Sequence, residues 1–167
     1  FGSVDILICN ASVRAQKSFQ EITVEEWHHT IAVTLNGAFF CARAAAPFMI
    51  KNRWGRIIGL GGMSSNLGMA KRLHVLAAKA GLVGIMRGLA TELAPHNITC
   101  NIVAPGHIET DRPKSAGPRP SAGTSPPINR LGVVEEIAGM IHYLCLPEAD
   151  YITGQTMHVN GGVYYGV

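Results

Sequence analysis

The side chains of this sequence that exchange protons most readily near neutral pH are its seven histidines. His107 follows Pro105-Gly106 at the end of an apolar stretch, so it is either part of a substrate-facing site or a solvated side chain. His74 stands at the start of a stretch rich in small residues, and it is either a proton donor or a polar surface or capping residue. The pair His28-His29 has no supporting neighbours, so we expect it on the surface.

Metal and thiol chemistry find little support in the residue spacing. No spacing of His, Cys, Asp or Glu is typical of a metal site. The four cysteines, Cys9, Cys41, Cys100 and Cys145, are widely spaced within apolar segments, and no C-x-x-C motif occurs. We therefore expect four buried, reduced thiols, which fits a reducing, cytoplasmic compartment.

The glycine cluster Gly59-Leu60-Gly61-Gly62-Met63-Ser64 is a candidate phosphate loop. It lacks the final glycine of G-x-G-x-x-G, and about 20 residues further on Lys79 stands where an acidic ribose ligand would be expected. We therefore interpret the cluster as the turn that follows a strand.

Short apolar runs alternate with longer helical patterns, which predicts a parallel sheet flanked by helices. The predicted strands span residues 4–9, 56–60, 98–103 and 155–159. One helix is predicted from the capping box Thr23-Val24-Glu25-Glu26 towards Pro47, and others over residues 74–93 and 135–146. Residues 112–129 hold five of the nine prolines and predict a long loop. We expect one domain over residues 1–167.

Composition excludes several classes of protein. The 167 residues are 47% hydrophobic and 15% charged, which excludes disorder for most of the chain. The net charge is +3 and the basic residues are scattered, so we expect no nucleic-acid partner. No apolar run approaches the roughly 20 residues of a membrane span, and no secretion signal is visible. Because the chain begins with Phe1 inside apparently structured sequence, we expect it to be part of a longer protein.

Four motifs follow one another along the chain: Asn10-Ala11-Ser12, Ala77-Ala78-Lys79-Ala80-Gly81-Leu82, Pro105-Gly106-His107-Ile108-Glu109-Thr110, and Tyr151-Ile152-Thr153-Gly154-Gln155 leading to Val159-Asn160-Gly161-Gly162. Their order resembles the short-chain dehydrogenase/reductase family over nearly the whole chain. The resemblance implies an α/β fold with a Rossmann-like, doubly wound parallel sheet. It also implies that this chain lacks the family's N-terminal β-α-β-α-β section, which carries the phosphate-binding turn.

The resemblance implies an oxidoreductase that transfers a hydride between NAD or NADP and a carbonyl or alcohol substrate. Ligands of such sheets lie at the carboxyl ends of the strands. The cofactor-facing positions implied are Asn10, Ala11, Ser12, Lys79, Pro105, Gly106, Ile108 and Thr110, with Ser12 in place of the family's glycine. Without the phosphate-binding turn, we expect weakened cofactor binding by this chain alone. The loop at 112–129 resembles the family's substrate lid.

The catalytic positions depart from the family pattern. Lys79 matches the family's lysine, which holds the nicotinamide ribose and lowers the pKa of a tyrosine four residues earlier. Val75 stands at that tyrosine position, Gly62 at the family's serine and Thr34 at its asparagine. The spacing of i and i+4 places Val75 and Lys79 on one helix face, but Val75 has no proton to exchange.

Neighbouring residues offer two substitutes. Aligning Ser64 or Ser65 with the lost serine shortens its spacing to the tyrosine position. His74 adjoins Val75, but adjacent helical residues point about 100° apart, so it would need a distorted helix start to reach the site.

Three functional readings stay open: an oxidoreductase that is incomplete here or uses another proton donor, a non-catalytic binding or partner subunit, and a fragment without function. Neither the substrate nor the choice between NAD and NADP is fixed by the sequence. A T-G-x-x-x-G-x-G turn upstream of residue 1 would favour the first reading.

The resemblance implies a homodimer or homotetramer that forms through the two long helices. Small residues that would allow close helix contact are Gly37, Ala38, Ala42, Ala44, Ala45, Ala46, Ala77, Ala80, Gly81, Gly84 and Gly88. The apolar strand at 4–9 is expected at the edge of the sheet, where it favours aggregation.

Overall fold

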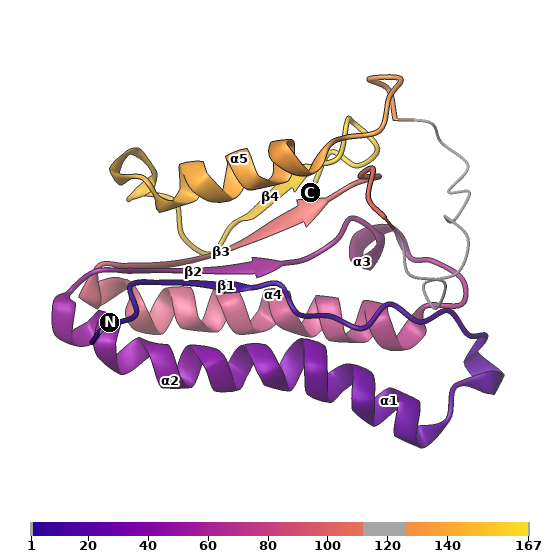
Figure 1. Cartoon of the computed structure of the whole chain (residues 1–167), viewed down its shortest axis with the longest axis horizontal. Coiled ribbons are helices and arrows are strands. Elements are labelled where there is room, and N and C mark those ends of the chain that lie inside the picture. Colours follow the sequence, from indigo (N-terminus) through magenta and orange to yellow (C-terminus); the bar gives the residue numbers. More distant parts are fainter. Residues whose placement is uncertain (1, 112–125, 167) are drawn as a thin grey trace.

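The computed structural model describes residues 2–111 and 126–166 as a parallel sheet with helices on both faces (Figure 1). Its strands are β1 (Ile6–Cys9), β2 (Gly55–Leu60), β3 (Ile98–Pro105) and β4 (Thr156–Val159). They are ordered β1-β2-β3-β4, and every pairing is parallel. The predicted α/β class and Rossmann-like parallel sheet are confirmed.

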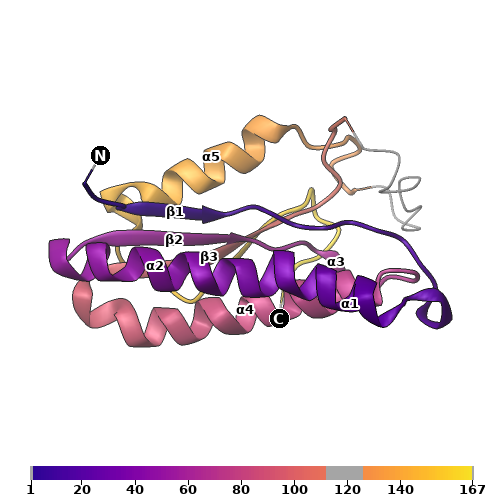
Figure 2. The same ribbon diagram turned by 60° about the horizontal axis from the view of Figure 1, so that its bottom comes forward.

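The helices form two layers around this sheet. They are α1 (Val24–Ile31), α2 (Gly37–Asn52), α3 (Ser64–Leu67), α4 (Leu73–Leu93) and α5 (Val134–Cys145). Figure 2 shows α1, α2 and α4 along one face of the sheet and α5 along the other. A π-turn at Ala32–Asn36 joins α1 to α2 without ending the helix.

Each of the central strands contributes to two hydrophobic cores. Ile57 is 0% exposed and lies in one core with Leu82 of α4, whereas Ile58 is 1% exposed and lies in the other with Leu144 of α5. Successive strand residues point to opposite faces, so a strand covered on both sides is apolar throughout. This explains the continuous apolar runs of the sequence.

The first long helix begins where its capping box predicts. The Thr23 hydroxyl accepts a hydrogen bond from the Glu26 amide at 3.2 Å, and the Glu26 carboxylate accepts one from the Thr23 amide at 3.0 Å. The expected end near Pro47 is wrong, because the helix continues to Asn52 and ends at Arg53 in the left-handed conformation. Pro47 is on the exposed side, while Met49 anchors the last turns in the core.

Small residues of α2 serve the core of this chain. Ala38, Ala42 and Ala45, expected at a subunit contact, are buried in the core between α2, α4 and the sheet. This corrects that part of the expectation, because small side chains also let a helix approach a sheet closely. Ala44, Gly84 and Gly88 stay exposed.

Two long helices meet the length and composition criteria of a membrane span although neither contains a continuous apolar run of that length. Two helical segments, Val24–Asn52 and Leu73–His96, have the length and composition of a membrane span, with mean hydropathy of 1.3 and 1.4. Both bury residues such as Met49 and Met86 in the core against the sheet. Core helices of this kind meet the same length and composition criteria.

The cysteines are all free, but they are not uniformly buried. Cys100 is buried, Cys9 and Cys145 are half-buried, and Cys41 is exposed, so the expected burial is wrong for Cys41. Burial raises the pKa of Cys9 to about 11 and that of Cys100 to about 12. Both thiols are therefore protonated at neutral pH and are weak nucleophiles.

The outer edge of β1 generates a prediction about association. Among the described residues β1 pairs only with β2, and Ile6 and Ile8 are 44% and 36% exposed. An unguarded apolar edge promotes pairing between chains, and lysines on it oppose such pairing. We expect Ile6→Lys/Ile8→Lys to reduce concentration-dependent association of the 167-residue chain, measured by light scattering. Equal scattering by the unmodified chain and by Ile6→Lys/Ile8→Lys would show that the β1 edge is not the surface through which the chains associate.

Candidate active site

The carboxyl ends of three neighbouring strands bring the predicted cofactor-facing loops together. Asn10 follows β1, Gly61 follows β2 and Gly106 follows β3. The amide of Gly61 donates to the Val103 carbonyl at 2.8 Å, and that of Met63 donates to the Pro105 carbonyl at 3.2 Å. These bonds fasten the loop after β2 to the end of β3.

Lys79 reaches this end of the sheet from α4. Its ammonium donates a hydrogen bond to the carbonyl oxygen of Leu60, the last residue of β2. Burial and the nearby Arg14 cation together lower the pKa of Lys79 to about 8, while Cys9 acts in the opposite direction. The lysine is therefore a partly desolvated cation at the point where the strands end.

Val75 and Gly62, expected at the family's tyrosine and serine positions, supply no polar side chain. Val75 is 6% exposed and stands four residues before Lys79 in α4. A Cβ atom built on Gly62 would meet only Ser64 Oγ, at 3.9 Å, so a larger side chain has room there. Ser65 Oγ donates to the Gly62 carbonyl at 2.7 Å, which commits that hydroxyl to the turn.

His74 is buried, which corrects its interpretation as a polar surface or capping residue. It is 1% exposed, and its Nδ1 atom has no hydrogen-bond partner among the described residues. Burial lowers the pKa of His74, Glu26 raises it, and Arg72 and Lys17 lower it. These charges differ from the groups that act on Lys79, so the two side chains face different surroundings.

Thr34, expected at the family's asparagine position, contacts the loop after β1. The residue is 2% exposed and lies inside the π-turn between α1 and α2. Its Oγ1 atom accepts a hydrogen bond from the Val13 amide at 3.3 Å and donates one to Ser12 Oγ, also at 3.3 Å. The structure thus brings together two residues that depart from the family pattern.

A close approach of two backbone segments explains why Gly106 follows β3. The Gly106 amide donates to the Val159 carbonyl at 2.9 Å, and a Cβ atom on Gly106 would lie 2.6 Å from the Asn160 Cα. No larger residue fits this close approach of two backbones. Further on, Ile108 bridges to Gly132, whereas Thr110 is exposed. His28 and His29 are exposed, as expected.

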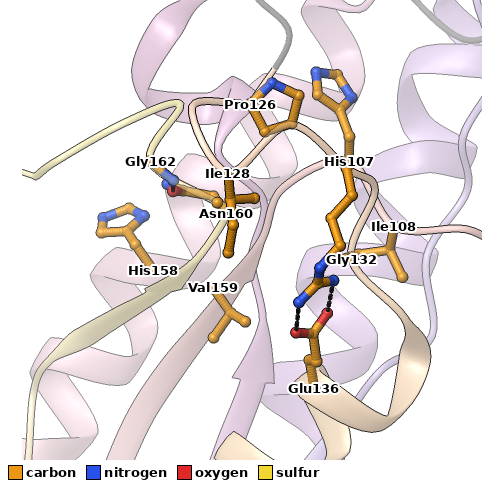
Figure 3. A pocket seen from close by; sticks show the side chains of 12 residues that line it. His107, Ile108, Pro126, Ile128, Gly132, Glu136, His158, Val159, Asn160 and Gly162 are labelled. Atoms are coloured by element: carbon orange, nitrogen blue, oxygen red, sulfur yellow. Dashed lines mark hydrogen bonds and ion pairs between the residues drawn. The ribbon is translucent and has the colours of Figure 1, made fainter.

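A cavity of about 280 Å³ opens beside this segment, between the ends of β3 and β4 and the start of α5 (Figure 3). His107, half-buried, lines it together with His158 and Asn160. A two-bond ion pair between Arg130 and Glu136, at 3.0 and 2.6 Å, forms part of its wall. Sequence reasoning missed this pair and His158, because neither belongs to a recognisable spacing. Lys79 is not among the residues that line this cavity.

Two further expectations concern this end of the sheet. Most of the lid-like loop, residues 112–125, lies outside the described residues. Over residues 2–111 and 126–166, no group of three or more His, Cys, Asp or Glu side chains is placed to hold a metal ion.

The burial of His74 predicts a pH dependence of stability. Its pKa is lowered from 6.5 in the folded chain, so below pH 6.5 the unfolded chain binds a proton that the folded chain resists. Stability should be highest above that pH and fall as the pH drops below it. We expect His74→Gln to show a smaller fall in melting temperature between pH 7 and pH 5. The exposed His28→Gln should behave like the unmodified chain, and an unchanged pH profile in His74→Gln would contradict the prediction.

Comparisons with known proteins place this arrangement in a family. A family model described as enoyl-(acyl carrier protein) reductase matches residues 1–164. The 3-oxoacyl-(acyl-carrier-protein) reductases of Salmonella typhimurium and Escherichia coli are each 42% identical over 166 residues, covering 98% of this chain and 68% of the relative. The corresponding reductase of Vibrio cholerae is 40% identical over the same shares. The chain therefore belongs to the short-chain dehydrogenase/reductase family of NAD(P)-dependent oxidoreductases.

Proposed function

We propose that this chain is the nicotinamide- and substrate-facing part of an NAD(P)-linked oxidoreductase domain that has lost the family's proton transfer. The observation that carries the proposal is the pair Val75 and Lys79. A buried hydrocarbon stands four residues before a lysine whose ammonium is hydrogen-bonded to the end of β2. The group that binds a ribose is retained, and the group that would protonate a substrate oxygen is replaced.

The chemistry of carbonyl reduction explains why this replacement matters. NAD(P)H, when bound, supplies the hydride, and the protein must supply a proton to the developing alkoxide. A positioned acid typically contributes 10²- to 10⁴-fold to such a rate. Val75 carries no ionisable group, and Gly62 offers no hydroxyl to the substrate oxygen. Lys79 then has no phenol whose pKa it can lower.

The residues present fit the nicotinamide end of the cofactor. The Lys79 ammonium could bind ribose hydroxyls, and the loop Asn10–Ser12 and Pro105-Gly106 border the same strand ends. The close backbone approach at Gly106 holds the loop after β3 in a fixed position. Within the described ranges, the glycine turn after β2 leads into the four-residue α3, which is too short to serve a pyrophosphate as a helix N-terminus.

An active reductase with another proton donor is the alternative. His74 is the titratable residue nearest to Val75 in sequence, and its buried Nδ1 has no hydrogen-bond partner among the residues that the structure describes. However, its electrostatic neighbours are Glu26, Arg72 and Lys17, and not the groups around Lys79. The geometry therefore favours the non-catalytic reading. Because the relatives are named for 3-oxoacyl groups, a 3-oxoacyl thioester is the carbonyl substrate to test first.

A chimera tests the loss of proton transfer. We would fuse this chain to the N-terminal part of the Escherichia coli relative that it does not match, and measure NADPH oxidation with a 3-oxoacyl thioester. We expect no turnover from the unmodified chimera. We expect Val75→Tyr/Gly62→Ser to raise the rate at least about 10²-fold by restoring the acid and the hydroxyl.

Matched variants separate chemistry from packing in this test. Val75→Phe with Gly62→Ser introduces nearly the same volume as tyrosine without its proton, so this chimera should stay inactive. Adding Lys79→Ala to the active double variant should abolish the gain. Saturable turnover by the unmodified chimera that is lost in His74→Gln would overturn the proposal in favour of the alternative.

The outer faces of α2 and α4 support a second part of the proposal, a homodimer. Phe40 and Phe48 of α2 are 60% and 44% exposed, and Gly84 and Gly88 of α4 leave open space beside their backbone. The two helices lie in one layer on the outside of the sheet (Figure 2). Exposed large apolar side chains on one helix and open space along a second helix of the same layer are typical of a helix-to-helix contact between subunits.

We expect the Ile6→Lys/Ile8→Lys chain to sediment as a dimer at micromolar concentration, because its β1 edge no longer contributes to association. Adding Phe40→Glu should shift it to the monomer, since burying an unpaired carboxylate opposes the contact. Phe19→Glu, at a residue that is 76% exposed near the start of α1, should leave the dimer intact. If the Ile6→Lys/Ile8→Lys chain sediments only as a monomer before Phe40 or Phe19 is changed, the dimer is refuted.

A further inference from the structure

Two departures from the family pattern, Thr34 and Ser12, contact each other in a closed ring of hydrogen bonds. Thr34 Oγ1 donates to Ser12 Oγ at 3.3 Å, and Ser12 Oγ donates to the Val13 carbonyl at 3.4 Å. The Val13 amide donates back to Thr34 Oγ1 at 3.3 Å. Each hydroxyl therefore donates once and accepts once, so the ring satisfies both.

The helix is shaped so that Thr34 reaches the loop. The π-turn at Ala32–Asn36 places an extra residue in the helix, with the Gly37 amide bonded to the Ala32 carbonyl five residues earlier. Such turns move one part of a helix surface relative to its neighbours and occur frequently at functional sites. Thr34 lies in the middle of this turn and is 2% exposed, so its hydroxyl is shielded from water.

The loop needs such support, because Asn10–Val13 has no regular secondary structure. The Asn10 amide donates to the Ile8 carbonyl at 3.1 Å, and the ring through Thr34 then fixes Ser12 and Val13. A glycine at position 12 would have no hydroxyl for the ring. An asparagine at position 34 carries both a donor and an acceptor on one side chain and would need no relay.

We propose that Thr34 and Ser12, at the positions where the family pattern has an asparagine and a glycine, act as a pair of positioning residues, which together hold the loop after β1 against the helix. The loop's role beside the nicotinamide rests on the proposed function, whereas the tether itself does not. The two substitutions thus compensate each other, unlike the substitutions at Val75 and Gly62.

Hydrogen exchange tests this tether without cofactor or substrate, so its outcome is independent of the proposed function. Exchange is followed by mass spectrometry in peptides that cover residues 10–16 at low micromolar concentration. Thr34→Val keeps the shape and removes the hydroxyl, and it should speed exchange of the loop about tenfold. Thr34→Ser keeps the hydroxyl and should retain the protection of the unmodified chain.

A double-mutant cycle tests the compensation. Ser12→Gly alone should speed exchange of the loop, because the relay hydroxyl is lost while Thr34 is still too short to replace it. In the Thr34→Asn background the same change should have little effect, so the two substitutions are non-additive. Thr30→Val removes another buried hydroxyl one turn earlier on the helix and should leave the loop unchanged.

Two results would overturn the proposal. One is unchanged protection of residues 10–16 in Thr34→Val. The other is an equal rise of exchange across the whole chain in both Thr34→Val and Thr30→Val, which would show a general loss of stability. If Thr34→Val does not fold, the additivity of Ser12→Gly and Thr34→Asn decides the question, because additive effects refute the pairing.

Discussion

The hydrogen bond from the Lys79 ammonium to the Leu60 carbonyl is the interaction around which the site is arranged. It joins α4 to the end of β2, at the point where the neighbouring strands also end. Desolvation of the ammonium, together with the nearby Arg14 cation, lowers the pKa of Lys79 to about 8. The position of Val75 relative to the strand ends follows from this attachment, since it lies on the same helix face four residues earlier.

The substitutions at the family's catalytic positions therefore fall into two classes. Thr34 is accompanied by Ser12, and their hydroxyls join the helix to the loop after β1. Val75 and Gly62 have no such partner, because one is hydrocarbon and the other is bordered by open space. In the function that we propose, the site is thus maintained at the positions that support loops and lost at the positions that would move a proton. A fold can persist after its usual chemistry has gone.

Much of this architecture could be predicted from the sequence, because it depends on patterns that a single chain carries. Continuous apolar runs identified the strands of a sheet covered on both faces, and the capping box at Thr23 located the start of the first long helix. The resemblance in motifs singled out Lys79 as a cofactor-facing residue, but its bond to the Leu60 carbonyl at the end of β2 has no sequence signal.

The remaining features depend on tertiary contacts that local patterns do not specify. A histidine at a helix start is ordinarily a surface or capping residue, yet His74 is 1% exposed, and the charges of Glu26 and Lys17 from other segments act on it. Pro47 does not end its helix, since Met49 is held in the core beyond it. The π-turn and the ring through Thr34 likewise need the loop after β1, which is 22 residues away in sequence.

The titration of the Lys79 ammonium tests the central claim most directly, because the claim is that this lysine is retained in a buried place without a proton-donating partner. We would label the lysines of the Ile6→Lys/Ile8→Lys chain isotopically and follow the Lys79 side-chain signal by NMR. The signal is assigned by its loss in Lys79→Arg. We expect one transition with a midpoint near pH 8. A midpoint near the ordinary value of 10.5 would contradict the burial of the amine. A second transition of the same signal, removed by His74→Gln, would reveal a coupled proton donor and contradict its loss.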